Sequence, residues 1–365
     1  MTGFAQSVIT IVLFILILGV LVVIHELGHF VTARLANVRV LEFGIGFPPR
    51  AKVLRAKGET LYSLNWLPLG GFVKLEGEDG DAANDPRAFS SKSLPVRLWI
   101  LVAGVLMNVL LAFVIFTGLA LYGDPTIGFQ VGTVQPGSPA EVAGVQSGDV
   151  LASVNGEYFG AFGGVALIDG LASHAGETVT VGIERPGVGE VTVQATLRTP
   201  EEVAAKKGAI GVSDLKVVTT GHPIQYSFVE AVKIGAQRTV DALGLILGGL
   251  GALVHSVATN PTGPPPVSGP VGIATQIGDV FWQLGPLFTL YIAGVLSANL
   301  AVVNVLPFPP LDGGRMLMIT LKRFFGSRIS LRAEQMTYVV GFVFLFGFII
   351  WVTGFDIARI VGGGT

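Results

Sequence analysis

Residues 4–29 read FAQSVITIVLFILILGVLVVIHELGH, an apolar run that ends in the pattern H-E-x-x-H. On a helix, His25 and His29 lie one turn apart on the same side, so both imidazoles can reach one metal ion. Glu26 projects from the neighbouring face and can reach a water molecule at that metal. The run Phe4–Ile24 is long enough to cross a bilayer. The stretch therefore predicts a hydrolytic metal site at the end of a membrane-spanning helix.

The composition is typical of a membrane protein. The 365 residues have a mean hydropathy of +0.67, and only 13% are charged, against about a quarter in soluble domains. A net charge of −2 lacks the basic excess of nucleic-acid-binding proteins, so no nucleic acid is expected as a partner. The chain has no cysteine, so any metal ligand must be His, Asp or Glu.

Four apolar stretches have the length of a membrane span. They are Phe4–Ile24, Leu98–Tyr122, Leu284–Leu306 and Met336–Val352. Ala242–Val254 is shorter, and with the amphipathic Tyr226–Arg238 before it, we expect an interfacial or packed helix rather than a span. The first stretch lacks the basic start and the small-residue cleavage site of a signal peptide, so it is interpreted as a retained span.

Basic residues in the short loops indicate the orientation of the chain. Arginines and lysines are concentrated between the first two spans and again between the last two, so both segments are predicted to be cytoplasmic. The N-terminus and residues 123–283 are then extracytoplasmic. His25 and His29 lie towards the cytoplasmic end of the first span, and the third span ends at the same depth.

Two regions have the alternating, turn-rich pattern of strands. Residues 38–80 contain four short β-prone runs, which predict a small sheet of hairpins that dips into the membrane. The runs are Arg39–Phe43, Ala51–Leu54, Thr60–Trp66 and Phe72–Leu75. Residues 126–200 form a second, soluble region, in which Gly137–Ala140, Ser147–Leu151 and Val154–Gly156 strongly resemble a PDZ domain. Ile127–Phe129 is a weak candidate for its carboxylate-binding loop.

A hydrolytic zinc site takes three protein ligands and keeps one position for water. His174, His222 and His255 fall in the external segments, on the wrong side of the membrane. Asp312 follows the third span in the segment N-V-L-P-F-P-P-L-D-G-G at 304–314. The prolines of this segment end the helix and its glycines permit a tight turn, so Asp312 is predicted to be the third ligand.

This combination of motifs resembles the site-2 protease family, the M50-type intramembrane zinc metalloproteases. It is most similar to the bacterial regulator-of-sigma-E protease branch, in a form with a single PDZ domain. The similarity covers essentially the whole chain, and Ala103–Asn108 resembles the A-G-P-x-x-N motif of the family's second span, with Val105 in place of the proline. The resemblance implies a zinc (Zn2+) metalloendopeptidase that cuts transmembrane segments.

The resemblance also suggests roles for individual residues. Glu26 would move protons, and Asn304 would hold the substrate or the developing oxyanion, although both Asn304 and Asn108 could instead join helices. An unwound substrate would pair with a sheet edge near the zinc. The predicted substrate-binding residues are Gly44, Gly46, Gly70, Gly71, Phe72, Asn108, Pro307 and Pro309.

The predicted fold is a polytopic α-helical membrane protein with about four transmembrane helices, a small membrane-associated β-sheet and an inserted extracytoplasmic PDZ β-domain. The predicted segments are the first transmembrane helix with H-E-x-x-H (1–37), a cytoplasmic or re-entrant β region (38–94), the second transmembrane helix (95–123), the PDZ domain (124–200), interfacial helices with a proline-rich linker (201–270), the third transmembrane helix with the aspartate motif (271–325), and the fourth transmembrane helix with the C-terminus (326–365).

The predicted function is the second cut in regulated intramembrane proteolysis, in the bacterial cytoplasmic membrane. Its partners would be the lipid bilayer and single-span substrates, such as anti-sigma factors or remnant signal peptides. The PDZ domain would either bind peptides or act as a size filter. Two alternatives stay open: a housekeeping protease that only degrades signal peptides, and a catalytically silent membrane PDZ scaffold for envelope proteins.

Overall fold

The computed structural model describes residues 3–56, 58–78, 85–162, 167–205, 208–326 and 330–362. The chain forms two compact units. The first, here called the helical unit, comprises Met1–Phe116 and Ala236–Thr365, and the second, the β unit, comprises Thr117–Gly235. Each unit is described separately.

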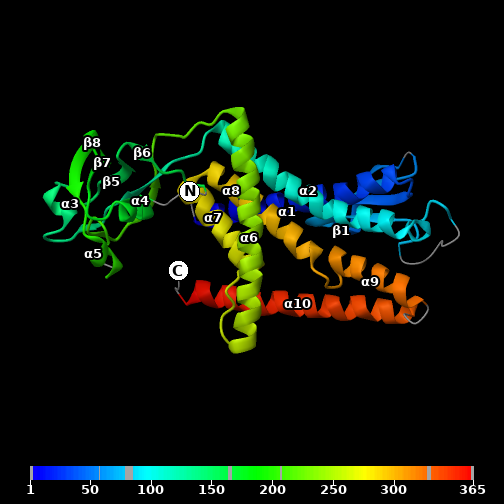
Figure 1. The fold of residues 1–365 in the computed structure, drawn as a ribbon. Helices are drawn as coiled ribbons and strands as arrows, with labels where there is room; N and C mark the ends of the chain where they lie inside the picture. The colour runs from blue at the N-terminus through cyan, green and yellow to red at the C-terminus, as the bar shows by residue number, and fades with distance from the viewer. Residues whose placement is uncertain are drawn as a thin grey trace. The chain divides into compact units, whose positions relative to one another are not determined.

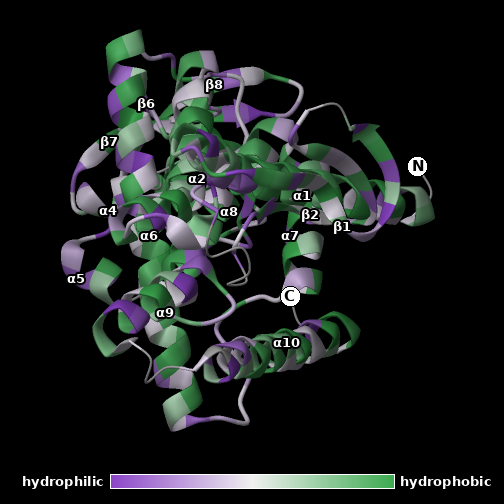
Figure 2. Ribbon diagram, turned by 90° about the vertical axis from the view of Figure 1, so that its right-hand side faces the viewer, coloured by the Kyte–Doolittle hydropathy of each residue, from purple (hydrophilic) through white to green (hydrophobic). Residues whose placement is uncertain are grey.

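Long apolar helices dominate the helical unit (Figures 1 and 2). The helices that lie wholly or partly in it are α1 (Gly3–Leu35), α2 (Leu94–Tyr122), α6 (Phe228–Thr259), α7 (Pro270–Leu284), α8 (Pro286–Val305), α9 (Asp312–Phe325) and α10 (Leu331–Val361), with the 3-10 turn η1 (Phe89–Ser91). Among the described residues, α1, α2, α6, α8 and α10 are long and apolar enough to cross a membrane. The chain is therefore a helical, multi-pass membrane protein, and the four predicted spans coincide with α1, α2, α8 and α10.

Helix α6 differs from its prediction. Tyr226–Arg238 and Ala242–Val254 were treated as two segments, but one helix of 32 residues, Phe228–Thr259, contains nearly all of both. Asp241, which lies between the two segments, does not interrupt the helix, because a single acidic residue leaves the backbone hydrogen bonds intact. By length and composition α6 is thus a fifth candidate span. Its residues 236–259 nevertheless run across the direction of α8 and α10 (Figure 1).

The spanning helices alternate in direction. The Trp282 indole in α7 donates a hydrogen bond to Thr10 Oγ1 near the start of α1 (3.3 Å), and Asp312, just beyond α8, meets His25 near the end of α1. Helices α1 and α8 therefore run the same way. Helix α2 runs against α1, because Ile100 lies at His29 and the later Asn108 lies at His25.

Helix α10 returns to the end of the helical unit that lies away from Asp312. Near its C-terminus, the Asp356 carboxylate accepts hydrogen bonds from the backbone N–H groups of Gly269 (3.2 Å) and Gly272 (2.9 Å) at the start of α7. Within the helical unit, Phe116 of α2 and Gly269 at the start of α7 therefore lie towards the same side.

The predicted small sheet is built from two bent strands, β1 (Val40–Arg55) and β2 (Leu61–Leu75). Their register places four segments side by side in the order 71–75, 40–45, 61–65 and 50–55. These segments correspond to the four β-prone runs of the sequence. Gly44 pairs with Phe72 on one side and Ser63 on the other, so it is interior. The substrate-binding edge was predicted at Gly44–Gly46 and Gly70–Phe72. The first part is wrong, whereas Gly71 and Phe72 lie in 71–75, which forms one edge of the sheet.

The β unit contains a six-stranded sheet of order β10-β3-β5-β7-β8, with β6 paired to β5, and a small β4-β9 pair. The strands are β3 (Ile127–Gln130), β4 (Thr133–Val134), β5 (Val150–Val154), β6 (Glu157–Tyr158), β7 (Thr178–Arg185), β8 (Gly189–Thr196), β9 (Val212–Ser213) and β10 (Lys216–Thr219), and the helices are α3 (Pro139–Val142), α4 (Leu167–Ser173) and α5 (Pro200–Ala204).

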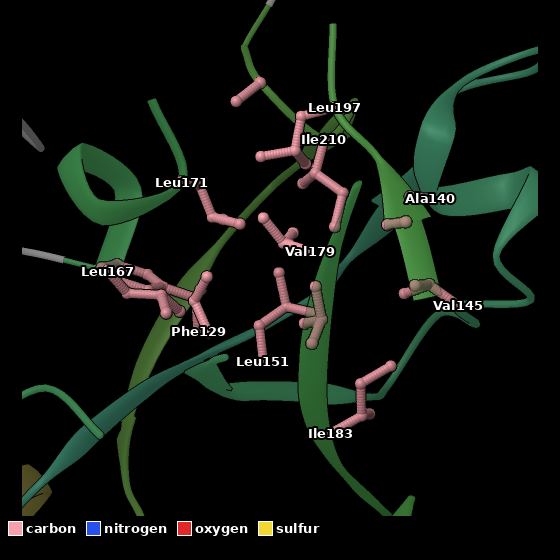
Figure 3. Close-up of a cluster of buried hydrophobic side chains, with 14 of the residues drawn as sticks. Phe129, Ala140, Val145, Leu151, Leu167, Leu171, Val179, Ile183, Leu197 and Ile210 are labelled. Atoms are coloured by element: carbon pink, nitrogen blue, oxygen red, sulfur yellow. The ribbon is translucent and has the colours of Figure 1, made fainter. Parts of the chain in front are cut away.

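The core of the β unit brings its sheet and helices together. Leu151 and Val179 from the sheet pack with Leu167 and Leu171 of α4 and with Ile210 (Figure 3). Strand β10 pairs with β3 along its whole length. The predicted domain end at residue 200 is therefore too early, because β9 and β10 complete the fold. These strands are only two and four residues long, too short to show the alternation that identifies strands in a sequence.

Candidate metal centre

Helix α1 and the start of α9 bring three potential metal ligands together. His25 Nε2 lies 2.9 Å from Asp312 Oδ2, and His29 Nε2 lies 3.3 Å from the same oxygen. The two Nε2 atoms are 3.1 Å apart. His25 is only 5% exposed and His29 only 8%. All three ligand atoms lie within 4.8 Å of one another, so a single ion can contact each of them.

Glycine lets α1 approach α2 closely at this centre. A Cβ atom built on Gly28 would overlap the backbone carbonyl of Ala103 and would stand 2.8 Å from the Met107 side chain. No larger residue fits this crossing without moving a helix. The approach brings His29 Nδ1 to 2.8 Å from the carbonyl oxygen of Ile100. Since a carbonyl can only accept, Nδ1 carries the proton and Nε2 keeps its lone pair for a metal.

Two further glycines allow Asp312 to turn towards the histidines. Helix α8 ends at Val305, where the prolines of the following segment cannot continue it. A Cβ on Gly313 would overlap the carbonyls of Val305 and Leu306, and one on Gly314 would overlap the backbone at Phe308 and Pro309. The chain can fold back on the end of α8 only with glycine at these positions, as the sequence predicted.

A cavity of about 390 Å³ opens beside the three ligands. Glu26 and Asn304 both line it, as expected of a general base and an oxyanion-binding amide. Gly71 and Phe72 also line it, from the edge strand of the small sheet. The cavity thus places a carboxylate, an amide and a strand edge around one metal-ligand set.

Six predicted substrate-binding residues are not among the described residues that line this cavity: Gly44, Gly46, Gly70, Asn108, Pro307 and Pro309. Gly44 lies inside the sheet. Gly46 and Gly70 have positive φ angles of 80° and 96° within β1 and β2, a backbone conformation that favours glycine. Pro309 packs against Gly341 of α10. Asn108 is fully buried, 3.2 Å from His25 Nδ1.

Several lining residues escaped the sequence analysis. Leu300 precedes Asn304 by one helical turn on α8, so helical spacing could have identified it. Arg315 follows Asp312 on α9 and forms an ion pair with Glu78. No motif marks Glu78, which follows the edge strand in a turn. Phe47 follows Gly46 in β1 and reaches the cavity because the strand bends there.

The ligand set fits zinc. Two imidazoles and one carboxylate are an established protein ligand set for catalytic zinc, which keeps a further position for water. The structure provides both requirements. The two imidazoles are buried, with the Ile100 carbonyl behind His29, and the cavity on the other side leaves room for the water. No cysteine is available for a structural thiolate site. The arrangement can therefore hydrolyse a peptide bond that reaches the cavity.

Comparison with known proteins agrees with this geometry. The sequence profile described as Peptidase family M50 matches residues 13–348. A chain from Clostridium acetobutylicum, provisionally named a zinc metalloprotease, is 32% identical over 96% of this chain and 98% of its own length. Zinc metalloprotease RasP is 28% identical in Shouchella clausii, over 96% of this chain and 99% of the relative, and 28% identical in Geobacillus kaustophilus, over 97% and 99%.

Proposed function

Because this chain belongs to Peptidase family M50, the site-2 proteases, and is a zinc metalloprotease, we propose that it cleaves the transmembrane segments of single-span membrane proteins. One observation carries the proposal: His25, His29 and Asp312 converge beside a cavity that Glu26 and Asn304 line. The histidines belong to α1, a helix with the length and composition of a span. Membrane depth excludes most soluble substrates from such a site.

The chemistry follows from the positions of these residues. Zinc bound by His25, His29 and Asp312 supplies a Lewis acid that polarises the peptide carbonyl and acidifies water. Glu26 accepts the proton of the attacking water and passes it to the leaving amine. The Asn304 amide donates a hydrogen bond to the oxyanion that develops on the substrate carbonyl.

The edge strand 71–75 accounts for how a helical substrate is held. A peptide bond inside a helix is shielded by the helix, so the substrate must unwind locally before hydrolysis. The 71–75 segment pairs with β1 on one side and contributes Gly71, Phe72, Val73 and Leu75 to the cavity on the other. An unwound substrate can add to this edge as a further strand, with its backbone hydrogen-bonded beside the metal.

The substrates are single-span proteins shortened by an earlier cut, with anti-sigma factors as the leading class and remnant signal peptides as a second. Cutting an anti-sigma factor would make this protease the second step of regulated intramembrane proteolysis. A role limited to signal-peptide clearance remains the alternative within the same chemistry.

The β unit is proposed to be a PDZ domain. A small groove of about 70 Å³ lies between α4 and residues 208–215, lined by Leu167, Leu171, Ile210 and Val212 among others. This strand-and-helix groove supports a peptide-binding role, whereas the alternative role is to block substrates with large outer domains. The suggestion that Ile127–Phe129 forms a carboxylate loop is wrong, since these residues are paired in the sheet.

The protease is proposed to lie in the bacterial cytoplasmic membrane, with its N-terminus and the β unit outside. In this topology α6 lies along the outer interface. In the helical unit, the described part of α2 ends on the side where Asp356 meets Gly269 at the start of α7. If α6 crossed the membrane once, α7 would begin on the opposite side. Interfacial packing of α6 is consistent with its direction across α8 and α10 (Figure 1).

The Glu26→Gln variant tests the proposed function. It keeps the three metal ligands but removes the base, so we expect full zinc content and a loss of cleavage of about 100-fold or more. The assay follows a purified single-span model substrate in detergent or vesicles, and Glu157→Gln, on the β unit, is the matched control. Cleavage by Glu26→Gln at the rate of the wild type would overturn the mechanism. If the cellular effects of the protein persisted in Glu26→Gln without any cleavage, the alternative of a catalytically silent PDZ scaffold would be favoured.

A further inference from the structure

We propose that Asn108 is a positioning residue, which accepts a hydrogen bond from His25 Nδ1 and so keeps His25 Nε2 free to bind zinc. The inference rests on the proposed role of His25 as a metal ligand. It replaces the predicted contact between Asn108 and the substrate, because Asn108 is fully buried behind His25.

The geometry places the Asn108 amide directly on the distal side of the His25 ring. The structure places the Asn108 amide nitrogen Nδ2 3.2 Å from Nδ1, while Nε2 on the opposite side of the ring faces Asp312 at 2.9 Å. The Asn108 carbonyl oxygen is buried and has no hydrogen-bond partner among the described residues. The described neighbours of Asn108 therefore do not determine whether its amide oxygen or its amide nitrogen faces His25.

The requirement of metal binding decides the orientation. The oxygen and nitrogen of an amide have nearly the same shape, so the hydrogen-bond network must assign them. If the amide N–H pointed at Nδ1, Nδ1 would accept and the ring proton would sit on Nε2, where it blocks the metal. If the amide oxygen points at Nδ1, the proton sits on Nδ1 and the lone pair of Nε2 faces the ion. Only this second orientation is compatible with a zinc ligand.

The same face of α2 contacts the Nδ1 atoms of both imidazoles. Ile100, Gly104 and Asn108 follow one another at intervals of four residues, so they form one stripe along the helix. The Ile100 carbonyl accepts from His29 Nδ1, and in the proposed orientation the Asn108 amide oxygen accepts from His25 Nδ1 in the same way. A Cβ on Gly104 would stand 2.5 Å from His29 Nε2 and 2.8 Å from His25 Cε1, so glycine makes room for both rings.

A contact from a third helix holds this stripe in place. The Ser297 hydroxyl of α8 donates a hydrogen bond to the backbone carbonyl of Asn108 (2.8 Å), and Ser297 is itself fully buried. The helix that leads to Asp312 is thus attached to the residue that orients His25. The turn of α2 that carries Asn108 therefore contacts both α1, which carries His25, and α8, which leads to Asp312.

The experiment compares three side chains at position 108 in the full-length protein in detergent. Zinc affinity is measured by competition with a chelator. Asn108→Leu has nearly the same size but no acceptor, and we expect its zinc affinity to fall by about 10- to 100-fold. Asn108→Asp keeps an acceptor, so its zinc affinity should stay close to that of the wild type. Leu106→Ala, on the exposed side of α2, should leave affinity unchanged.

Unfolding of the metal-free variants separates positioning from packing. The inference requires a loss of zinc affinity in Asn108→Leu with an unfolding midpoint like that of metal-free wild type. Wild-type affinity in Asn108→Leu would overturn it, and so would an equal loss in Asn108→Asp and Asn108→Leu. If Asn108→Leu does not fold, Asn108→Ala replaces it as the variant without an acceptor, and its zinc affinity is compared with that of Asn108→Asp. If a variant without the His25 imidazole bound zinc as tightly as the wild type, both this inference and the proposed function would be overturned.

Discussion

Gly28 of α1 and Ala103 of α2 lie so close together that a Cβ atom on the glycine would overlap the alanine carbonyl. This crossing lies between His25 and His29. It packs α1 against the face of α2 formed by Ile100, Gly104 and Asn108, which contacts both imidazole rings. The separation of two helix backbones is therefore part of the metal site. A change of one methyl group at this crossing should alter both the stability of the protein and its metal content.

The substitution Gly28→Ala should move α1 away from α2. Overpacking of this kind costs about 1–3 kcal/mol, and the displaced His29 would lose its short contact with the Ile100 carbonyl. We expect a lower midpoint of thermal unfolding and less bound zinc after purification. Gly19→Ala is the control, because its Cβ would lie an ordinary 3.8 Å from the Pro68 carbonyl. Equal zinc content and stability in both variants would contradict the role of the crossing.

Removal of the carboxylate at position 356 should loosen the start of α7. Asp356 is 3% exposed and accepts from two N–H groups that the helix itself cannot satisfy. Loss of a helix cap costs about 0.5–2 kcal/mol, so Asp356→Leu should lower the free energy of unfolding by at least this much. Denaturant unfolding in detergent measures it. Asp279→Asn, exposed on α7, should have no effect, and a neutral Asp356→Leu would refute the cap.

An ion pair in the β unit should make its stability depend on pH. Burial opposes ionisation of Asp149, but hydrogen bonds from Arg185 at 2.9 and 2.8 Å hold the pKa of Asp149 below its ordinary value. A carboxyl whose pKa is lowered by folding stabilises the native state above its unfolded pKa of about 4, and this stabilisation decreases as the pH falls through the native pKa.

Hydrogen exchange of the full-length protein tests this dependence. At pH 7, Asp149→Asn should lower the opening free energy of peptides from β5 and β7 by about 1–3 kcal/mol. The difference between variant and wild type should shrink below pH 4. A difference that is the same at pH 7 and at pH 3 would show that the charge of Asp149 does not contribute.

The absence of cysteine makes the topology accessible to labelling. Single cysteines at Asp241 in α6 and at Asn260 just after it should react with a membrane-impermeant reagent from the same side as one at Ser147. A cysteine at Ser91 should react from the other side. Labelling of positions 241 and 260 from opposite sides would show that α6 spans the membrane, and would overturn its interfacial placement.

The metal centre was the part most fully predicted from the sequence, because each ligand had a local signal. Four-residue spacing placed His25 and His29 on one face of α1. The proline and glycine residues around Asp312 indicated a tight turn there. The third ligand could be identified only because few acidic or histidine residues share its depth. The structure brings these three together, as predicted.

The errors concern pairing between distant segments. Gly44 was taken as a strand edge, but edges depend on the partner strands, and Ser63 covers its other side. Asn108 was assigned either to the substrate site or to helix packing. Its contact with His25 could not be predicted, because it depends on how α2 packs against α1, some eighty residues earlier in the chain. The end of the β unit was misplaced because β10 becomes a strand only by pairing with β3.

The chain separation of the ligands has a consequence for biosynthesis. His25 and Asp312 are 287 residues apart, and the helix preceding Asp312 must be inserted beside α1 before the two can meet. A ribosome that has produced only the first three-quarters of the polypeptide therefore carries no functional protease. Its own unfinished helices, and those of other proteins being inserted nearby, are safe from attack until synthesis of the enzyme is nearly finished.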